Sequence, residues 1–202
     1  MSKLGSLFGA QDMTRGKPMT NLLRFSIPLL IGNFAQQMYS TVDSIVVGRY
    51  VGDAALSSIG TTLPVVNLLM VLFMAVATGV GIMVAQYYGA KDQESLTKSV
   101  GNAMTAVFVS GLAIMAIGIP LASSLLRLTN TPPETFDMAR SYLVIILYGI
   151  LFTGYYNIVS GILRGLGNTI FPLIALLLAS LLNTVLDVWF VAGLGMGVAG
   201  AA

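Results

Sequence analysis

Charged residues are spaced so widely along this chain that long uncharged stretches dominate it. Residues 54–90 contain no Asp, Glu, Lys or Arg, and similar gaps separate Lys98 from Arg127 and Arg140 from Arg164. Each gap is long enough for a membrane-spanning helix, which needs about 20 residues. Only 9% of the residues are charged, whereas soluble domains carry about 25%. The chain is therefore predicted to be an all-α polytopic membrane protein.

Five spanning helices and the start of a sixth follow from these gaps and from the turn residues between them. We expect a polar lead-in over residues 1–20, before a first span that continues past Asp43. The predicted helices cover residues 21–47, 54–85, 97–126, 141–163 and 169–192, with the sixth beginning at 197–202. Because this sixth segment has no polar end, we expect the chain to be incomplete.

The distribution of lysine and arginine predicts the orientation. With a cytoplasmic N-terminus, only Arg49, Arg127 and Arg140 of the 10 basic residues would lie outside. Cytoplasmic segments are usually the richer in Lys and Arg. We therefore expect the lead-in to be cytoplasmic.

Several classes of function are excluded by composition. The chain has no cysteine and no histidine, which rules out disulfides, zinc–thiolate sites and histidine-based catalysis. A net charge of +2 is too small and scattered for a nucleic-acid surface. We expect neither an enzyme nor an organic cofactor.

Two aspartates lie within predicted spans, where a carboxylate costs about 2.5–3.5 kcal/mol. Asp43 lies four residues before the predicted end of its helix and Asp187 lies four before Val191, so both would be about 6 Å below the outer helix ends. Asn183 shares a helix face with Asp187, and Tyr39 and Gln36 share the face of Asp43. Either aspartate alone is compatible with a hydrated helix end. Their matched depth favours an oxygen-rich site for sodium or a proton, and the residues leave both ions open.

Other motifs are less specific. Pro28 interrupts the backbone hydrogen bonds of the first predicted helix and would kink it. Gly161 and Gly165 have the GxxxG spacing of close helix contacts, which is weak evidence in a chain with 22 glycines.

Several segments, taken together and in order, resemble the multidrug and toxic compound extrusion family. Residues 23–33 (LRFSIPLLIGN), 36–43 (QQMYSTVD) and 47–52 (VGRYVG) resemble the family's first helix. The segments at 161–169 (GILRGLGNT), 182–187 (LNTVLD) and 197–202 (GVAGAA) resemble later parts of its first lobe.

This resemblance implies a twelve-helix antiporter with two six-helix lobes, of which the chain would supply the N-terminal lobe and lack the C-terminal one. Such a protein would export small organic, often cationic, compounds across the plasma membrane in exchange for sodium or protons. The family's cation or proton site corresponds to Asp43, Asn183 and Asp187. Its supporting residues and bending proline correspond to Tyr39, Asn157 and Pro28, with Asn157 nearer the inner side than the aspartates.

Two other functions remain as alternatives. A lipid-linked precursor flippase of the same superfamily would be expected to place basic residues in its cavity, whereas every arginine here is predicted at a helix end. A membrane scaffold or partner subunit would not need paired intramembrane carboxylates. An enzyme is the least favoured, since no nucleophile and base set is visible.

Overall fold

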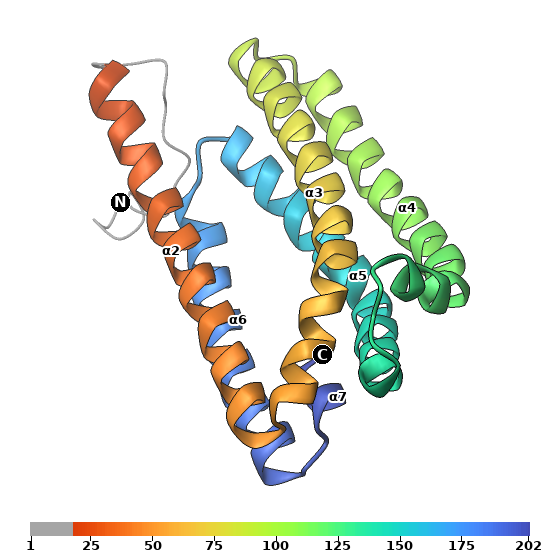
Figure 1. Ribbon diagram of the computed structural model, residues 1–202. Helices are drawn as coiled ribbons and strands as arrows, with labels where there is room; N and C mark the ends of the chain where they lie inside the picture. The colour runs from red at the N-terminus through yellow and green to blue at the C-terminus, as the bar shows by residue number, and fades with distance from the viewer. Residues whose placement is uncertain (1–17) are drawn as a thin grey trace.

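The computed structural model describes residues 18–202, so most of the predicted lead-in lies outside the described residues. The helices are α2 (Pro18–Tyr50), α3 (Asp53–Gly89), α4 (Gln93–Leu128), η1 (Pro133–Thr135), α5 (Phe136–Gly165), α6 (Ile170–Asp187), η2 (Val188–Gly193) and α7 (Val198–Ala201) (Figure 1). The all-α membrane class is confirmed. Most of the long helices run several residues beyond their predicted ends, because a helix does not stop where its apolar stretch does.

Four segments of the described chain are long and apolar enough to cross a membrane. They are Asp53–Gly89, Gln93–Leu128, Pro133–Gly165 and Ile170–Gly193. The helix α2 is 33 residues long but is not among them. Its middle carries the polar side chains of Asn33, Gln36, Gln37, Ser40 and Thr41, which lower its hydropathy without interrupting the helix.

The helices form two groups that diverge toward one end (Figure 1). In one group α5 packs extensively against both α3 and α4, and in the other α2 packs along α6. Few residues join α2 to α3 or α5 to α6. The groups meet at the end where α2 turns into α3, and we call this the closed end. The opposite end, where α2 begins, is the open end.

A row of small residues allows α3 and α5 to approach backbone to backbone. A Cβ added to Gly81 would lie 2.8 Å from the carbonyl oxygen of Gly161. A Cβ on Gly161 would collide with the carbonyl oxygen of Ala77, and one on Gly165 with that of Gly81. The Gly161–Gly165 spacing therefore does mark a helix contact.

An apolar cluster joins four helices at the closed end. Val47 of α2, Ala55 and Ile59 of α3, Tyr142 of α5 and Val198 of α7 are buried against one another. Burial of such side chains stabilises a contact by about 25 cal/mol per Å² of apolar surface. This cluster holds the ends of α2 and α5 together beside the site described below.

The turns between helices use residues suited to them. Gly52 precedes α3 with φ of 100° and Gly167 follows α5 with φ of 81°, conformations in which glycine has no Cβ penalty. Asp92 caps α4 by accepting a 3.0 Å hydrogen bond from the Ser95 backbone N–H. Hydrogen bonding from Ser95 lowers the pKa of the Asp92 carboxyl.

Candidate cation site and the adjoining cavity

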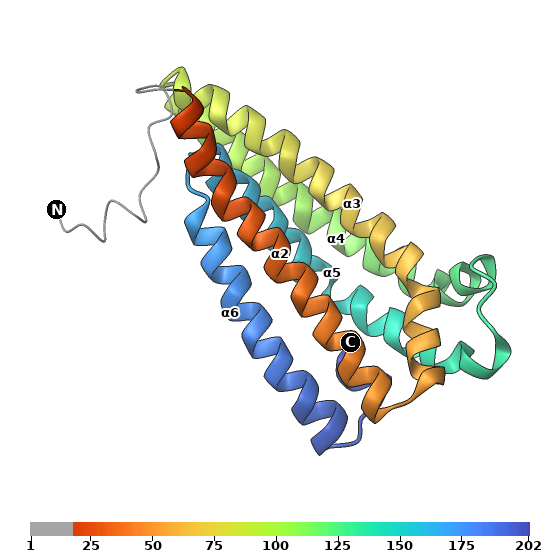
Figure 2. The ribbon, with the colours of Figure 1, turned by 60° about the vertical axis from the view of Figure 1, so that its left-hand side comes forward.

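Asp43 and Asp187 come together because α2 packs along α6 (Figure 2). Asp187 is the last residue of α6 and only 3% exposed, and Asp43 is half-buried. The helix α2 continues to Tyr50, so Asp43 lies about 10 Å from its end at 1.5 Å per residue. It is thus about a turn deeper than predicted. The two carboxylates are close enough to interact electrostatically.

Three buried oxygens at this position accept no hydrogen bond from any described residue. They are Asp43 Oδ1, Asn183 Oδ1 and Asp187 Oδ2. Buried polar atoms are nearly always paired, because leaving one unpaired costs about 1–3 kcal/mol. Oxygen atoms alone are the ligands preferred by hard cations, and carboxylates also accept protons. The donor set therefore fits a small hard cation or a proton.

Two tyrosines flank the carboxylates. Tyr39 of α2, one turn before Asp43, is half-buried and interacts electrostatically with both carboxylates. Tyr142 of α5 is 7% exposed and interacts electrostatically with Asp43, Tyr39 and Asp187. Sequence reasoning missed Tyr142. Its position near the outer end of the predicted fourth helix, at a depth similar to the aspartates, was the available signal.

The helix changes its winding directly after Asp187. The predicted helix over 169–192 is instead an α-helix to Asp187 and a π-helix from Val188 to Gly193. The backbone N–H of Leu194 accordingly donates to the carbonyl of Trp189 five residues earlier, at 2.9 Å. π-Helical turns are rare and concentrate at functional sites. This wider turn lies immediately beside one of the three unpaired oxygens.

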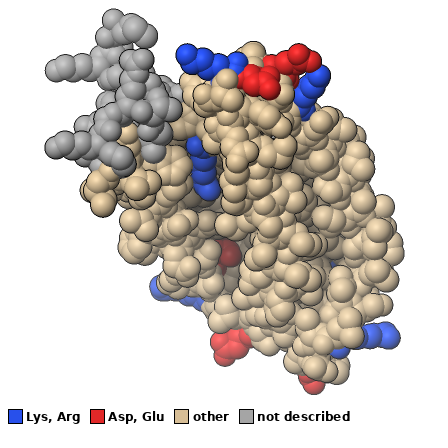
Figure 3. Space-filling model, turned by 90° about the horizontal axis from the view of Figure 1, so that it is seen from above, with Lys and Arg blue, Asp and Glu red and all other residues tan. Residues whose placement is uncertain are grey.

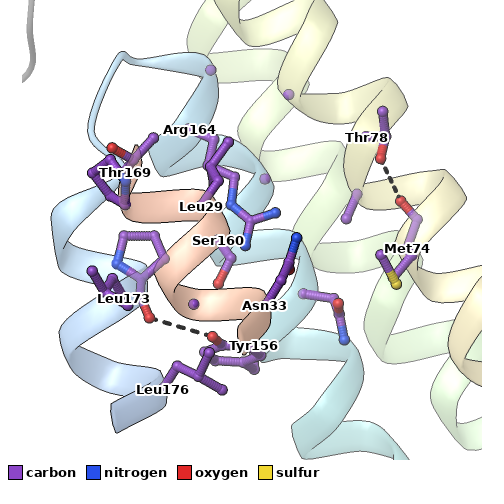
Figure 4. A pocket seen from close by; sticks show the side chains of 18 of the residues that line it. Leu29, Asn33, Met74, Thr78, Tyr156, Ser160, Arg164, Thr169, Leu173 and Leu176 are labelled. Carbon is purple, nitrogen blue, oxygen red and sulfur yellow. Dashed lines mark hydrogen bonds between the residues drawn. The ribbon is translucent and has the colours of Figure 1, made fainter. Parts of the chain in front are cut away.

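A cavity of about 600 Å³ lies between the two helix groups, on the open-end side of the carboxylates. Its walls come from α2, α3, α5 and α6 (Figure 4). Seen from the open end, the surface between the groups is hollowed, and acidic atoms are recessed within the hollow (Figure 3). Gln36 lines the cavity seven residues before Asp43, a separation of about 10 Å along the helix.

Several predicted residues thus line the cavity and do not join the carboxylates. Gln36 and Pro28 contribute from α2, and Asn157 contributes from α5. Asn157 was predicted to lie nearer the inner side than the aspartates, and it lines the cavity. Its side-chain amide donates to the carbonyl of Thr153 at 2.9 Å. The Tyr156 hydroxyl donates to the carbonyl of Pro172 at 3.3 Å and joins α5 to α6.

One expectation about charge is wrong. Arginines at helix ends were expected to stay out of the cavity, yet Arg164, in the last turn of α5, lines it. The long side chain reaches back along the helix, and its guanidinium group points toward Asn33 and Ser160 (Figure 4). An arginine at a helix end can therefore still make the cavity basic.

The family model, the similar sequences and the similar solved structures all indicate one protein family. The family model described as MatE matches residues 28–189. A probable multidrug resistance protein, YpnP of Bacillus subtilis, is 34% identical over 96% of this chain and 43% of its own length. Solved structures of MATE in the bent and straight conformations share 31% and 30% identity, with TM-scores of 0.87 and 0.86. The chain is covered completely in both, and spans 44% and 43% of those chains. It therefore spans less than half the length of these relatives.

Proposed function

Because the chain belongs to the multidrug and toxic compound extrusion (MatE) family, we propose that the protein exports small organic compounds in exchange for sodium ions or protons. We further propose that Asp43, Asn183 and Asp187 hold the coupling ion. The main support is that three buried oxygens at this site accept no hydrogen bond from the described residues. A sodium ion or a proton would satisfy the same atoms, and either would offset the like charge of the two carboxylates.

The helix α2 connects the carboxylates to the cavity. Tyr39 lies between the carboxylates and the cavity along α2, and Gln36 is on the cavity wall. Binding of an ion would remove the repulsion between the carboxylates of α2 and α6, which lie beyond Gln36 of the cavity wall. Release of the ion restores that repulsion. A change in ion occupancy would therefore alter how α2 packs against the cavity.

Pro28 supplies a place where α2 can bend. It lines the cavity within an otherwise continuous helix, and a proline removes one backbone hydrogen bond from its helix. MATE structures similar to this chain are known in a bent and a straight conformation, and we propose that α2 is the helix that changes shape here.

Replacing Pro28 by alanine is expected to reduce efflux several-fold while raising thermal stability. Alanine restores the missing hydrogen bond, and proline costs about 3 kcal/mol relative to alanine inside a helix. Melting temperature of the purified protein and dye efflux from cells would be measured together. Pro64→Ala in α3 is the matched control, because Pro64 lies inside a helix but does not line the cavity. Unchanged efflux in Pro28→Ala would show that transport does not require bending at this residue.

Export itself is tested in a drug-sensitive bacterium that expresses the protein as its gene encodes it. We expect cells to accumulate less of a fluorescent organic cation than cells with an empty vector. Collapsing the proton gradient or the sodium gradient with selective ionophores should restore accumulation, and the effective ionophore identifies the coupling ion. Equal accumulation in expressing and control cells, with the protein present in the membrane, would refute the proposal.

We propose that the protein lies in the plasma membrane, and the distribution of lysine and arginine supports a cytoplasmic N-terminus. Since the chain has no cysteine, single cysteines can test this directly. A membrane-impermeant maleimide should label Glu134→Cys, between α4 and α5, and spare Glu94→Cys at the start of α4 in intact cells. The reverse labelling pattern would contradict the orientation.

A further inference from the structure

Arg164 carries the only charge among the described residues that line the cavity. The lining includes no Asp or Glu, and no described carboxylate forms an ion pair with Arg164. An arginine guanidinium offers five N–H donors in a planar fork that matches carboxylate and phosphate oxygens. The part of the cavity near Arg164 is therefore electropositive and rich in donors.

The other polar groups on the cavity wall fall into two classes. Thr78 donates to the carbonyl of Met74 at 2.8 Å, while Tyr156 and Asn157 also donate to carbonyls of the chain. In contrast, no hydrogen bond within the described part of the chain engages the side chains of Ser160, Asn33, Gln36 and Thr169. Ser160 is 4% exposed and lies one turn before Arg164 on the same helix face.

Arg164, Ser160 and Asn33 line the same cavity. Figure 4 shows the guanidinium group directed toward the Asn33 and Ser160 side chains, which come from α2 and α5. Together they offer a cation, a hydroxyl and an amide to one region of the cavity. Charge-assisted bonds to such donors are about twice as strong as neutral ones.

The remainder of the wall is mostly apolar. Leu29, Met74, Leu173 and Leu176 border the same space, and thioether side chains adapt to varied shapes. The volume of about 600 Å³ lies within the range of small-molecule pockets, about 300–1,000 Å³. An apolar body with one anionic group matches both the shape and the charge of the site.

We propose that the cavity binds the anionic group, a carboxylate or phosphate, of an amphiphilic ligand at Arg164, Ser160 and Asn33. This inference names a substrate class for the export proposed above and rests on it. Asp43 and Asp187 do not line the cavity but lie beyond Gln36 of its wall along α2. Because Arg164 is the one charged residue among the described lining residues, a cationic group elsewhere on the ligand would not meet a positive charge from the cavity wall. Two sources share this chemistry, a water-soluble acid and a phospholipid headgroup.

The test compares two dyes that differ only in one acidic group: rhodamine 19, a free carboxylic acid, and rhodamine 6G, its ethyl ester. Binding is measured by fluorescence anisotropy, without an ion gradient, on the protein as its gene encodes it in phosphatidylcholine nanodiscs. The wild type should bind the acid more tightly than the ester. Arg164→Gln should weaken acid binding about tenfold, the effect of losing one charge-assisted hydrogen bond, and leave ester binding nearly unchanged.

Two variants guard against a general effect of the substitution. Arg164→Lys keeps the charge and should retain most of the preference for the acid. Arg49→Gln removes an exposed arginine in the last turn of α2 that does not line the cavity and should behave as wild type. If the acid and ester bind equally to the wild type, or if Arg164→Gln leaves their ratio unchanged, the inference is wrong.

The source of the anion is separated by repeating the measurement with phosphatidylglycerol in the nanodiscs. Competition by this anionic lipid in the wild type but not in Arg164→Gln supports the inference with a phospholipid phosphate as the ligand. Lack of competition supports a soluble acid. Because binding needs no ion gradient, a preference that depends on Arg164 would persist even if export failed. Conversely, ion-driven export of the ester with no effect of Arg164→Gln would overturn only this inference.

Discussion

Adding a single methyl group at Gly161 is expected to destabilise the protein by about 3 kcal/mol, the upper end for overpacked sites. The new Cβ of Gly161→Ala would collide with the backbone carbonyl of Ala77 on α3. Backbone atoms within a helix cannot rotate away as a side chain can, so α3 and α5 must separate. Since α5 also forms the cavity wall and carries Tyr142, the loss should extend to the whole three-helix group.

Thermal unfolding of the purified protein, followed by fluorescence, measures this effect. Gly149→Ala is the matched control on the same helix, because a Cβ there meets no atom within 4 Å. Inside a helix, alanine is favoured over glycine by about 1 kcal/mol, so the control should be neutral or more stable. Opposite signs for the two substitutions are the expected result. A Gly161→Ala protein as stable as Gly149→Ala would show that α3 and α5 do not pack as described.

Replacing Asp187 by asparagine is expected to reduce ion-driven efflux at least tenfold without destabilising the protein. Asparagine keeps the shape and one oxygen but neither carries charge nor accepts a proton. A buried ionic group loses hydration on folding and contributes to stability only when fully paired. Removing the charge therefore weakens ion binding, while the ion-free protein becomes as stable as the wild type or more so.

Dye efflux from cells and the amount of protein in the membrane are measured together, because they separate a loss of ion coupling from a loss of stability. Asp43→Asn should reproduce the loss, and Asp53→Asn, an exposed aspartate in the first turn of α3, should leave efflux intact. The double variant of Asp43 and Asp187 should lose little more than either single one, because both act on one ion. Full efflux in Asp187→Asn would remove this residue from the coupling site.

The class of fold and the pairing of the two carboxylates could be predicted because both depend on strong local signals. A long uncharged stretch predicts a membrane-spanning helix, and an aspartate within such a stretch is easily identified. The structure places Asp43, Asn183 and Asp187 together, and their role in ion binding stays a prediction.

Features that depend on three-dimensional packing were not predictable in the same way. Tyr142 reaches the carboxylates from α5; its depth in the membrane follows from the sequence, but the packing of its helix end beside α2 does not. The π-helix after Asp187 was not predicted, because the local sequence would also support an ordinary α-helix; in the structure η2 lies against α2 and α7. Arg164 was misjudged because its place at a helix end says nothing about the direction of a long, flexible side chain.

We propose above that Asp43, Asn183 and Asp187 together hold the coupling ion. The most direct measurement is the melting temperature of the wild type and Asp187→Asn in sodium chloride and in choline chloride at equal ionic strength, repeated across a range of pH. A ligand at 100 times its dissociation constant stabilises a protein by about 2.7 kcal/mol. We predict that sodium or acid raises the wild-type melting temperature and that the same response is absent in Asp187→Asn. An equal rise of the melting temperature in both proteins would show that the ion binds elsewhere and would contradict the proposed site.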